Sequence, residues 1–130
     1  MINLLIYVFV LLFLIIVLST IFTSIITQKI KRSIPKFGKT TVLQDAEIHW
    51  YEAGQGRPII MLHGLAGNLR NFTYALTEQL DKDYRVIAID RAGCGWSKRS
   101  QPEIATLQGQ ARIISEFIEQ EQIEKPLIVG

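Results

Sequence analysis

The stretch Pro58-Ile59-Ile60-Met61-Leu62-His63-Gly64-Leu65-Ala66-Gly67 decides the fold. It opens with five apolar residues, two of them β-branched, which is typical of a strand buried on both faces of a parallel sheet. The run stops at His63-Gly64, and a helical pattern follows from Asn71. A buried strand, a tight turn and a helix form half of a βαβ unit. Ligands of open α/β sheets bind just beyond the carboxyl ends of the strands, so the loop is a candidate site or a plain structural turn.

The chain after this loop continues to alternate between strand and helix. Apolar residues at helical spacing, with Asn68 or Asn71 as the cap, predict a helix up to Leu80. A strand over 84–90, an amphipathic helix over 104–118 and a third buried strand at 126–130 follow. Upstream, the segments 40–43 and 47–52 are rich in β-branched and aromatic residues and predict a hairpin. The order indicates a parallel sheet covered by helices on both faces, with right-handed crossovers.

The N-terminal segment predicts a membrane anchor. Residues 1–28 contain no charged side chain, and the apolar run over 2–26 exceeds the roughly 20 residues that cross a bilayer core. A cleaved signal peptide is the competing interpretation, but it would need a basic start and small residues at a cleavage site. A buried core helix would usually be shorter than this segment, which is apolar all round. We therefore expect an anchor over 1–28, a basic juxtamembrane linker over 29–39 and a further domain over 40–130.

The charged residues are unevenly distributed, and this predicts an orientation. Five bases fall within 29–39 without an acid, whereas acids slightly outnumber bases from Thr40 onward. The positive-inside rule places such a cluster in the cytoplasm, where it can also contact anionic lipid headgroups. A local basic patch of this kind does not indicate nucleic-acid binding. Cys94 is the single cysteine, and two distant histidines with one cysteine do not form a zinc site.

Three motifs, in this order and spacing, resemble the α/β-hydrolase superfamily. The first is 62–67 after a hydrophobic strand, and the second is Asp90-Arg91-Ala92-Gly93-Cys94-Gly95-Trp96-Ser97, which is similar to the family's Asp-x-x-Gly-x-Gly-x-Ser loop. The third, 124–130, resembles the strand that leads into the nucleophile elbow. The resemblance covers about 40–130. It implies the N-terminal half of an α/β-hydrolase fold, a mostly parallel sheet with flanking helices, preceded by one transmembrane helix.

The resemblance also implies roles for individual residues. Gly130 matches the first glycine of the elbow Gly-x-Ser-x-Gly, so the nucleophile, acid and base are expected beyond this chain, which would then be truncated before the catalytic serine. The Leu65 backbone N–H would be one donor of the oxyanion hole. Six residues would structure the loops near the site: His63, Gly64, Asp90, Gly93, Gly95 and Ser97. Neither Ser97 nor Cys94 is expected to be a nucleophile, and His49, inside a strand, is expected to be a hydrogen-bonded or surface histidine.

The function implied by the resemblance is that of a membrane-anchored serine hydrolase with a Ser-His-Asp mechanism. It would cut an ester or related acyl bond in a small molecule and would need no cofactor or metal. The superfamily also includes dehalogenases, epoxide hydrolases, peptidases and cofactor-free peroxidases, so the reaction subtype stays open. The alternative is a catalytically inactive fragment, or a membrane-tethered interaction module on the same fold.

Overall fold

The computed structural model describes residues 2–130, apart from the side chains of Ile2 and Lys31. The chain divides into two compact units, with the boundary between Lys36 and Phe37. The first unit is built on one helix, α1 (Ile2–Ser33), and the second contains all the strands. The predicted anchor and the predicted α/β domain therefore fall into separate units.

Helix α1 is long and apolar enough to cross a membrane over Asn3–Ile30. At a rise of about 1.5 Å per residue, its 32 residues extend over about 48 Å, more than the roughly 30 Å of a bilayer core. An N-terminal signal sequence can also meet this criterion of length and hydropathy, so the helix alone does not separate the two interpretations. The helix continues to Ser33, so the first part of the segment expected to be a linker is helical. Gln, Lys and Arg are good helix formers, and Pro35 follows just after the helix ends.

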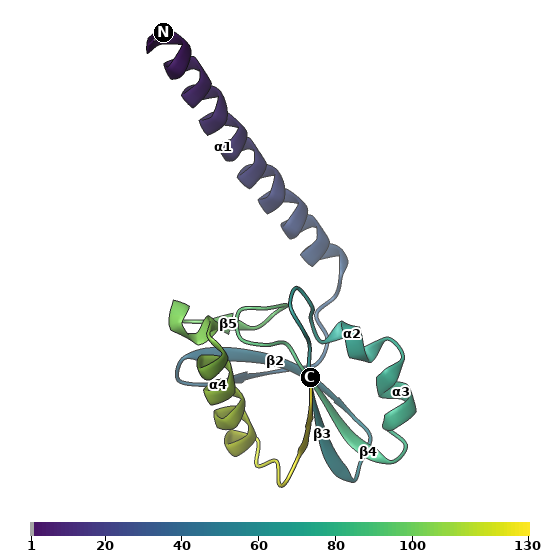
Figure 1. Ribbon diagram of the computed structural model, residues 1–130. Helices are drawn as coiled ribbons and strands as arrows, with labels where there is room; N and C mark the ends of the chain where they lie inside the picture. Colours follow the sequence, from purple (N-terminus) through teal and green to yellow (C-terminus); the bar gives the residue numbers. More distant parts are fainter. Residues whose placement is uncertain (1) are drawn as a thin grey trace. The chain divides into compact units, whose positions relative to one another are not determined.

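The second unit is built on a mixed sheet, shown with its helices in Figure 1. The strands are β1 (Lys39–Val42), β2 (Ala46–Ala53), β3 (Arg57–Leu62), β4 (Tyr84–Ile89), β5 (Lys98–Arg99) and β6 (Leu127–Val129). They are ordered β1-β2-β4-β3-β6, and β5 pairs with β2. Strand β3 is parallel to β4 and β6, whereas β2 is antiparallel to β1, β4 and β5.

The prediction of a mostly parallel sheet is therefore wrong, whereas the predicted hairpin of β1 and β2 is present. The reason is the short connection between β2 and β3, which contains only Gly54, Gln55 and Gly56. A parallel pair needs a crossover of about a dozen residues or more. A loop of three residues is too short for this and reverses the chain direction. The two strands of this reversal are then separated in the sheet by β4.

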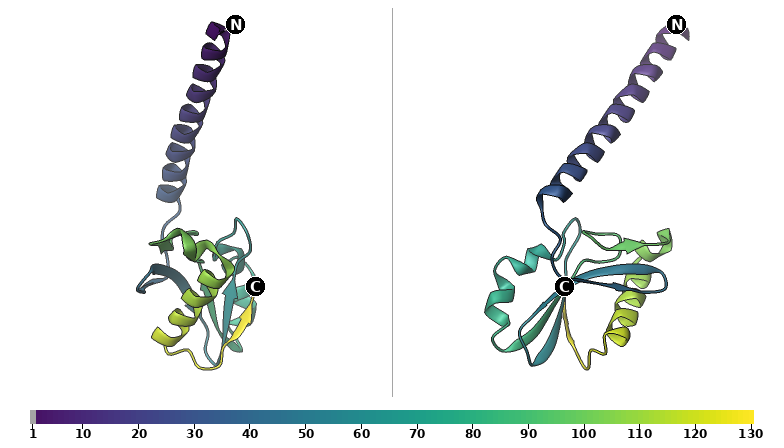
Figure 2. Two further views of the ribbon diagram at one scale, coloured as in Figure 1. Left: turned by 60° about the vertical axis from the view of Figure 1, so that its left-hand side comes forward. Right: turned by 180° about the vertical axis from the view of Figure 1, so that it is seen from behind.

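Helices cover both faces of the sheet, as Figures 1 and 2 show. The short helices α2 (Arg70–Thr73) and α3 (Leu76–Leu80) lie on one face, and α4 (Leu107–Gln120) lies on the other. The sequence predicted one helix where α2 and α3 stand, but the chain breaks at Ala75, whose φ of −147° is not helical. A 3-10 turn, η1 (Pro102–Ala105), precedes α4, and the Thr106 hydroxyl caps α4 by accepting from the Gly109 N–H at 3.1 Å.

The core follows from the alternation of side chains along β3 and β4. Ile60, Ile87 and Ile89 face α4 and form the larger cluster with Trp50 and Phe117. Their neighbours along the strands face α2 and α3 and form the smaller cluster: Ile59, Met61 and Val86. Since successive strand residues point to opposite faces, a continuous apolar run is what a sheet with two covered faces requires.

Strand β6 pairs in parallel with β3, as predicted, and lies at the edge of the sheet. The pattern of this strand predicts burial on both faces in a complete sheet, and within the described residues Leu127, Ile128 and Val129 are 38%, 57% and 47% exposed. Within the described residues no element covers them on both faces, because α4 packs against the other strands and leaves a groove beside β6.

Candidate active site

The loop after β3 starts with a buried histidine. The His63 side chain is 2% exposed, and its Nε2 accepts a hydrogen bond from the Arg91 backbone N–H at 3.1 Å. The other ring nitrogen, Nδ1, lies 2.9 Å from the Gly64 carbonyl oxygen. Because Nε2 is an acceptor, the proton of the neutral ring is on Nδ1, which donates to Gly64. His63 therefore joins the ends of β3 and β4 and holds the start of the loop that follows β3.

The next four residues form a tight turn open to solvent. The Gly67 N–H donates to the Gly64 carbonyl oxygen at 3.3 Å, and Ala66 adopts a left-handed φ of 57°. Such a conformation is uncommon for a residue other than glycine and is often found at functional sites. The Leu65 side chain is 96% exposed. A Cβ built on Gly64 would meet nothing within 4 Å, so this glycine leaves open space in front of the loop rather than serving packing.

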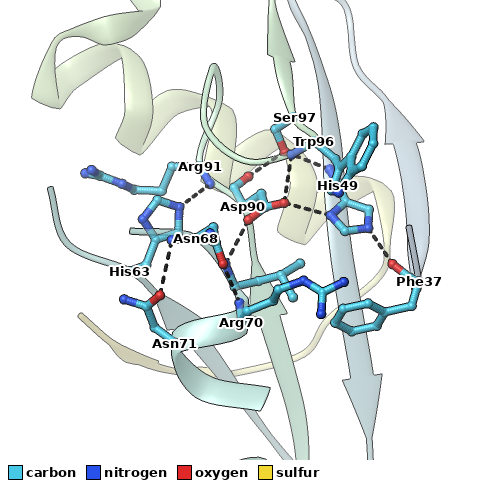
Figure 3. Close-up of polar contacts among 11 residues, drawn as sticks. Phe37, His49, His63, Asn68, Arg70, Asn71, Asp90, Arg91, Trp96 and Ser97 are labelled. Carbon is cyan, nitrogen blue, oxygen red and sulfur yellow. Dashed lines mark hydrogen bonds and ion pairs between the residues drawn. The ribbon is translucent and has the colours of Figure 1, made fainter. Parts of the chain in front are cut away.

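The carboxylate of Asp90 lies at the centre of the polar network in Figure 3. Asp90 follows β4 and is 1% exposed, and its carboxylate accepts three hydrogen bonds. The Leu69 N–H donates to its Oδ1 at 2.8 Å, while its Oδ2 accepts from the Trp96 N–H at 3.0 Å and from His49 Nδ1 at 2.7 Å. One buried carboxylate thus joins β2, the end of the loop after β3, and its own loop.

His49 is the buried partner of that carboxylate. Its side chain is 1% exposed, and its Nε2 faces the carbonyl oxygen of Phe37 while its Nδ1 faces Asp90. Both ring nitrogens therefore face oxygen atoms, a carboxylate oxygen at Nδ1 and a backbone carbonyl oxygen at Nε2. This histidine has no lone pair directed at an open surface, so it cannot act as a base from this position.

A serine, a histidine and an aspartate meet here, but they are not arranged as a catalytic triad. The Ser97 hydroxyl donates to the Asp90 backbone carbonyl at 2.6 Å and accepts from the His49 backbone N–H at 2.8 Å. Among the described residues, this hydroxyl makes no hydrogen bond to an imidazole ring, which a nucleophile needs for activation. Ser97 is also only 7% exposed. The three side chains brace the two loops.

The glycines of the second motif have distinct surroundings. Gly95 has a φ of +53°, and a Cβ on it would collide with the Asp90 carboxylate. Gly93 has a φ of +86°, and a Cβ there would contact the Arg99 guanidinium. The loop can wrap closely around Asp90 only because residue 95 has no side chain.

A cavity of about 540 Å3 lies between the end of β3, α4 and β6. Its lining includes His63, Gly64, Arg91, Gln110 and Gly130. Two buried polar atoms of this lining, Arg91 Nε and Gln110 Oε1, have no hydrogen-bond partner among the described residues. Its remaining surface is largely aliphatic, contributed by Leu62, Leu107, Ile114, Ile118 and Ile128. An apolar cavity with a few converging polar groups, at the carboxyl end of a strand, has the form of a small-molecule site.

Arg91 and Phe37 are site residues that the sequence analysis did not single out. The Arg91 guanidinium donates from Nη2 to the Gly64 carbonyl oxygen at 3.2 Å. Phe37 accepts from His49, packs edgewise on Tyr51 at 5.2 Å, and lies under the Arg70 guanidinium at 4.5 Å. The sequence gives only a weak indication for Arg91, namely that it directly follows Asp90 of the second motif. Phe37 carried no signal, since its partners are distant in sequence.

The alpha/beta hydrolase fold family model matches residues 57–130, which is more than half of the chain. The chain belongs to this family. The matched region contains the loop after β3, the Asp90 loop, α4 and β6, so all the site residues described above except those on β2 and Phe37 lie within it.

Known relatives agree on the family and differ in the reactions that their names state. The chain is 36% identical over 92 residues to 2-hydroxy-6-oxo-6-(2'-aminophenyl)hexa-2,4-dienoic acid hydrolase of Metapseudomonas resinovorans, covering 65% of this chain and 30% of that protein. An esterase from Exiguobacterium antarcticum superposes with a TM-score of 0.62 at 28% identity, over 72% of this chain and 35% of that one. A meta-cleavage product hydrolase gives a TM-score of 0.65 at 28% identity, over 73% and 36%. The chain spans about a third of the length of the curated relatives it matches.

Proposed function

We propose that these residues form the oxyanion side of a serine hydrolase that cuts an ester or related acyl bond in a small molecule. The observation that carries the proposal is the position of Gly130. A Cβ built on Gly130 lies 3.5 Å from the carbonyl oxygen of Leu62, the residue before His63, and Gly130 lines the same cavity as His63 and Gly64. A residue that follows Gly130 therefore starts beside the oxyanion loop, where the family's elbow would place its serine.

The proposed mechanism is acyl transfer. The serine hydroxyl of the elbow attacks the substrate carbonyl, a histidine takes its proton, and an acid orients that histidine. The nucleophile, histidine and acid are proposed to follow Gly130 in the full-length protein. The Leu65 N–H would stabilise the oxyanion that develops in the transition state, together with a second donor from the elbow. The open space in front of Gly64 leaves room for the reacting carbonyl.

A pair of substitutions at Leu65 tests this proposal in the full-length protein. Leu65→Pro removes the backbone N–H and should lower kcat for an aryl ester by about a hundredfold or more. Leu65→Ala keeps the N–H and removes a side chain that is 96% exposed, so it should have a much smaller effect. Equal activity of the two variants, with matching circular dichroism spectra, would remove Leu65 from the mechanism. A correctly folded wild type without hydrolase activity would instead favour a non-catalytic interaction module.

We further propose that α1 is a retained single-pass anchor in the lipid bilayer, with the N-terminus outside and the hydrolase unit in the cytoplasm. The charge-free length of α1 and the bases that end it support this proposal. Alkaline extraction should leave the protein in the membrane pellet, and a reporter that works only in the cytoplasm should be active after fusion downstream of residue 130. Release into the supernatant would indicate cleavage, and activity of a reporter that works only outside would reverse the orientation.

A further inference from the structure

We propose that Arg91 is a positioning residue for the Leu65 N–H: its guanidinium, together with the His63 ring, holds the Gly64 carbonyl oxygen and so orients the peptide group that carries this donor. The proposal rests on the proposed function of Leu65. It assigns to Arg91 a role through the oxyanion loop and not a contact with the substrate.

The Gly64 carbonyl oxygen accepts from three donors. His63 Nδ1 lies at 2.9 Å, Arg91 Nη2 at 3.2 Å, and the Gly67 backbone N–H at 3.3 Å. Arg91 acts twice, because its backbone N–H also holds His63 Nε2 at 3.1 Å and thereby keeps the ring proton on Nδ1. Two of the three donors to Gly64 therefore depend on residue 91.

The peptide bond converts this carbonyl contact into the orientation of an N–H. The Gly64 carbonyl and the Leu65 N–H belong to one peptide group, and the structure has no cis peptide bond among the described residues. In a planar trans peptide the C=O and N–H point in opposite directions. Holding the Gly64 oxygen toward Arg91 and His63 therefore directs the Leu65 N–H away from them.

Packing does not supply this orientation. The Leu65 side chain is 96% exposed, and no atom lies within 4 Å of a Cβ built on Gly64. Ala66 stays in the left-handed region, which is unfavourable for alanine, so the turn needs contacts that hold it there. The hydrogen bonds to the Gly64 oxygen, from His63, Arg91 and Gly67, link the turn to its neighbours.

The charge of Arg91 adds a second effect. A cation that binds a carbonyl oxygen polarises the peptide group, and hydrogen bonds linked in this way strengthen one another. The Leu65 N–H should therefore be a better donor to a developing oxyanion than an N–H whose carbonyl partner faces water. This effect acts in the transition state, where the oxyanion forms, and so it should alter kcat more than KM.

The experiment compares Arg91→Gln, Arg91→Lys and a control, Arg112→Gln, in the full-length protein. Arg112 lies on α4 and pairs with Asp45 at 2.9 Å, away from the loop. Gly64-Leu65 is the only Gly-Leu pair in these 130 residues. Labelling glycine carbonyls with 13C and leucine amides with 15N therefore assigns a single correlation in this region to the Gly64 carbonyl and the Leu65 amide.

We expect Arg91→Gln to move the Gly64 carbonyl signal upfield and to lower kcat by about tenfold with KM unchanged, less than the loss on removing the donor itself. Arg91→Lys, which keeps the charge, should recover most of both effects, and Arg112→Gln should change neither. An unchanged carbonyl signal in Arg91→Gln would overturn the proposal. So would unchanged kcat in Arg91→Gln while Leu65→Pro is inactive, and that result would leave the proposed function standing. If Leu65→Pro also keeps full activity, the proposed function fails, and the role of Arg91 fails with it.

Discussion

Replacing Asp90 by Asn tests whether one buried carboxylate holds the candidate site together. The carboxylate is 1% exposed and accepts from the Leu69 N–H, the Trp96 N–H and His49 Nδ1. Asparagine has the same shape but only one oxygen, and its NH2 group must replace either Oδ1 or Oδ2. In one orientation it meets the Leu69 N–H, and in the other it meets the Trp96 N–H and the His49 ring. Every orientation leaves at least one buried donor without an acceptor.

The expected loss of stability follows from these contacts. A buried N–H without a partner costs about 1–3 kcal/mol. At least one of these donors loses its acceptor, so we expect Asp90→Asn to lower the free energy of unfolding by about 1–3 kcal/mol. The matched control is Asp45→Asn, whose ion pair with Arg112 at 2.9 Å has an Arg112 side chain that is 53% exposed. Exposed pairs contribute about 0–1 kcal/mol, so this identical chemical change should cost little.

The assay is urea unfolding of the full-length protein and the two variants at pH 7, followed by fluorescence. A shift of the midpoint without a change of slope reports stability alone. If Asp90→Asn costs no more than Asp45→Asn, then the network around Asp90 does not hold the two loops, and the reasoning from its three hydrogen bonds is wrong. Adding His49→Gln in a double-mutant cycle should give a coupling energy between residues 49 and 90 of about 0.5–3 kcal/mol, whereas simple additivity would show that they act independently.

Two other changes have defined outcomes. Gly64→Ala should leave the free energy of unfolding within about 0.5 kcal/mol of the wild type, because its Cβ meets nothing within 4 Å and its φ is not left-handed. It should nevertheless lower kcat/KM by about tenfold or more, since the methyl group enters the space proposed for the substrate; unchanged turnover would place the substrate elsewhere. Burial raises the pKa of Glu52, but hydrogen bonds from Lys39 and Arg85 outweigh it and hold this pKa below the ordinary value of 4.5. The carboxylate therefore stabilises the fold above that value and loses its effect as the pH falls through the lowered pKa. Glu52→Gln should be less stable than the wild type by at most about 1 kcal/mol at pH 7 and equal to it at the acid end, and a difference that grows on acidification would contradict this.

The local sequence patterns predicted the strands and helices that alternate along the chain as βα units. Strands β3 and β4 and helix α4 were identified because hydrophobic periodicity and turn residues are short-range signals. The hairpin of β1 and β2 was found for the same reason. The break at Ala75 was missed, since the spacing of Phe72, Leu76 and Leu80 fits one helix as well as two.

Long-range pairing could not be predicted from these patterns. Nothing near β2 indicates that it will join β4 rather than β3, and the antiparallel half of the sheet follows from that choice. His49 and Asp90 are 41 residues apart, and their contact exists only because β2 and β4 are adjacent. Arg91 reaches Gly64 across 27 residues in the same way. The motif residues were predicted from a resemblance, whereas the partners that orient them depend on the three-dimensional order of the strands.

This order also explains where the second unit begins. Phe37 is its first residue, and its carbonyl oxygen accepts from His49, which in turn holds Asp90. Its ring lies under the guanidinium of Arg70, at the start of α2, the helix that follows the loop after β3. A chain that started after Phe37 would leave His49 Nε2 buried without its acceptor and Arg70 without this ring. Since an unpaired buried donor costs about 1–3 kcal/mol, Phe37 contributes to the stability of the network around Asp90 although it lies within the segment predicted to be a linker.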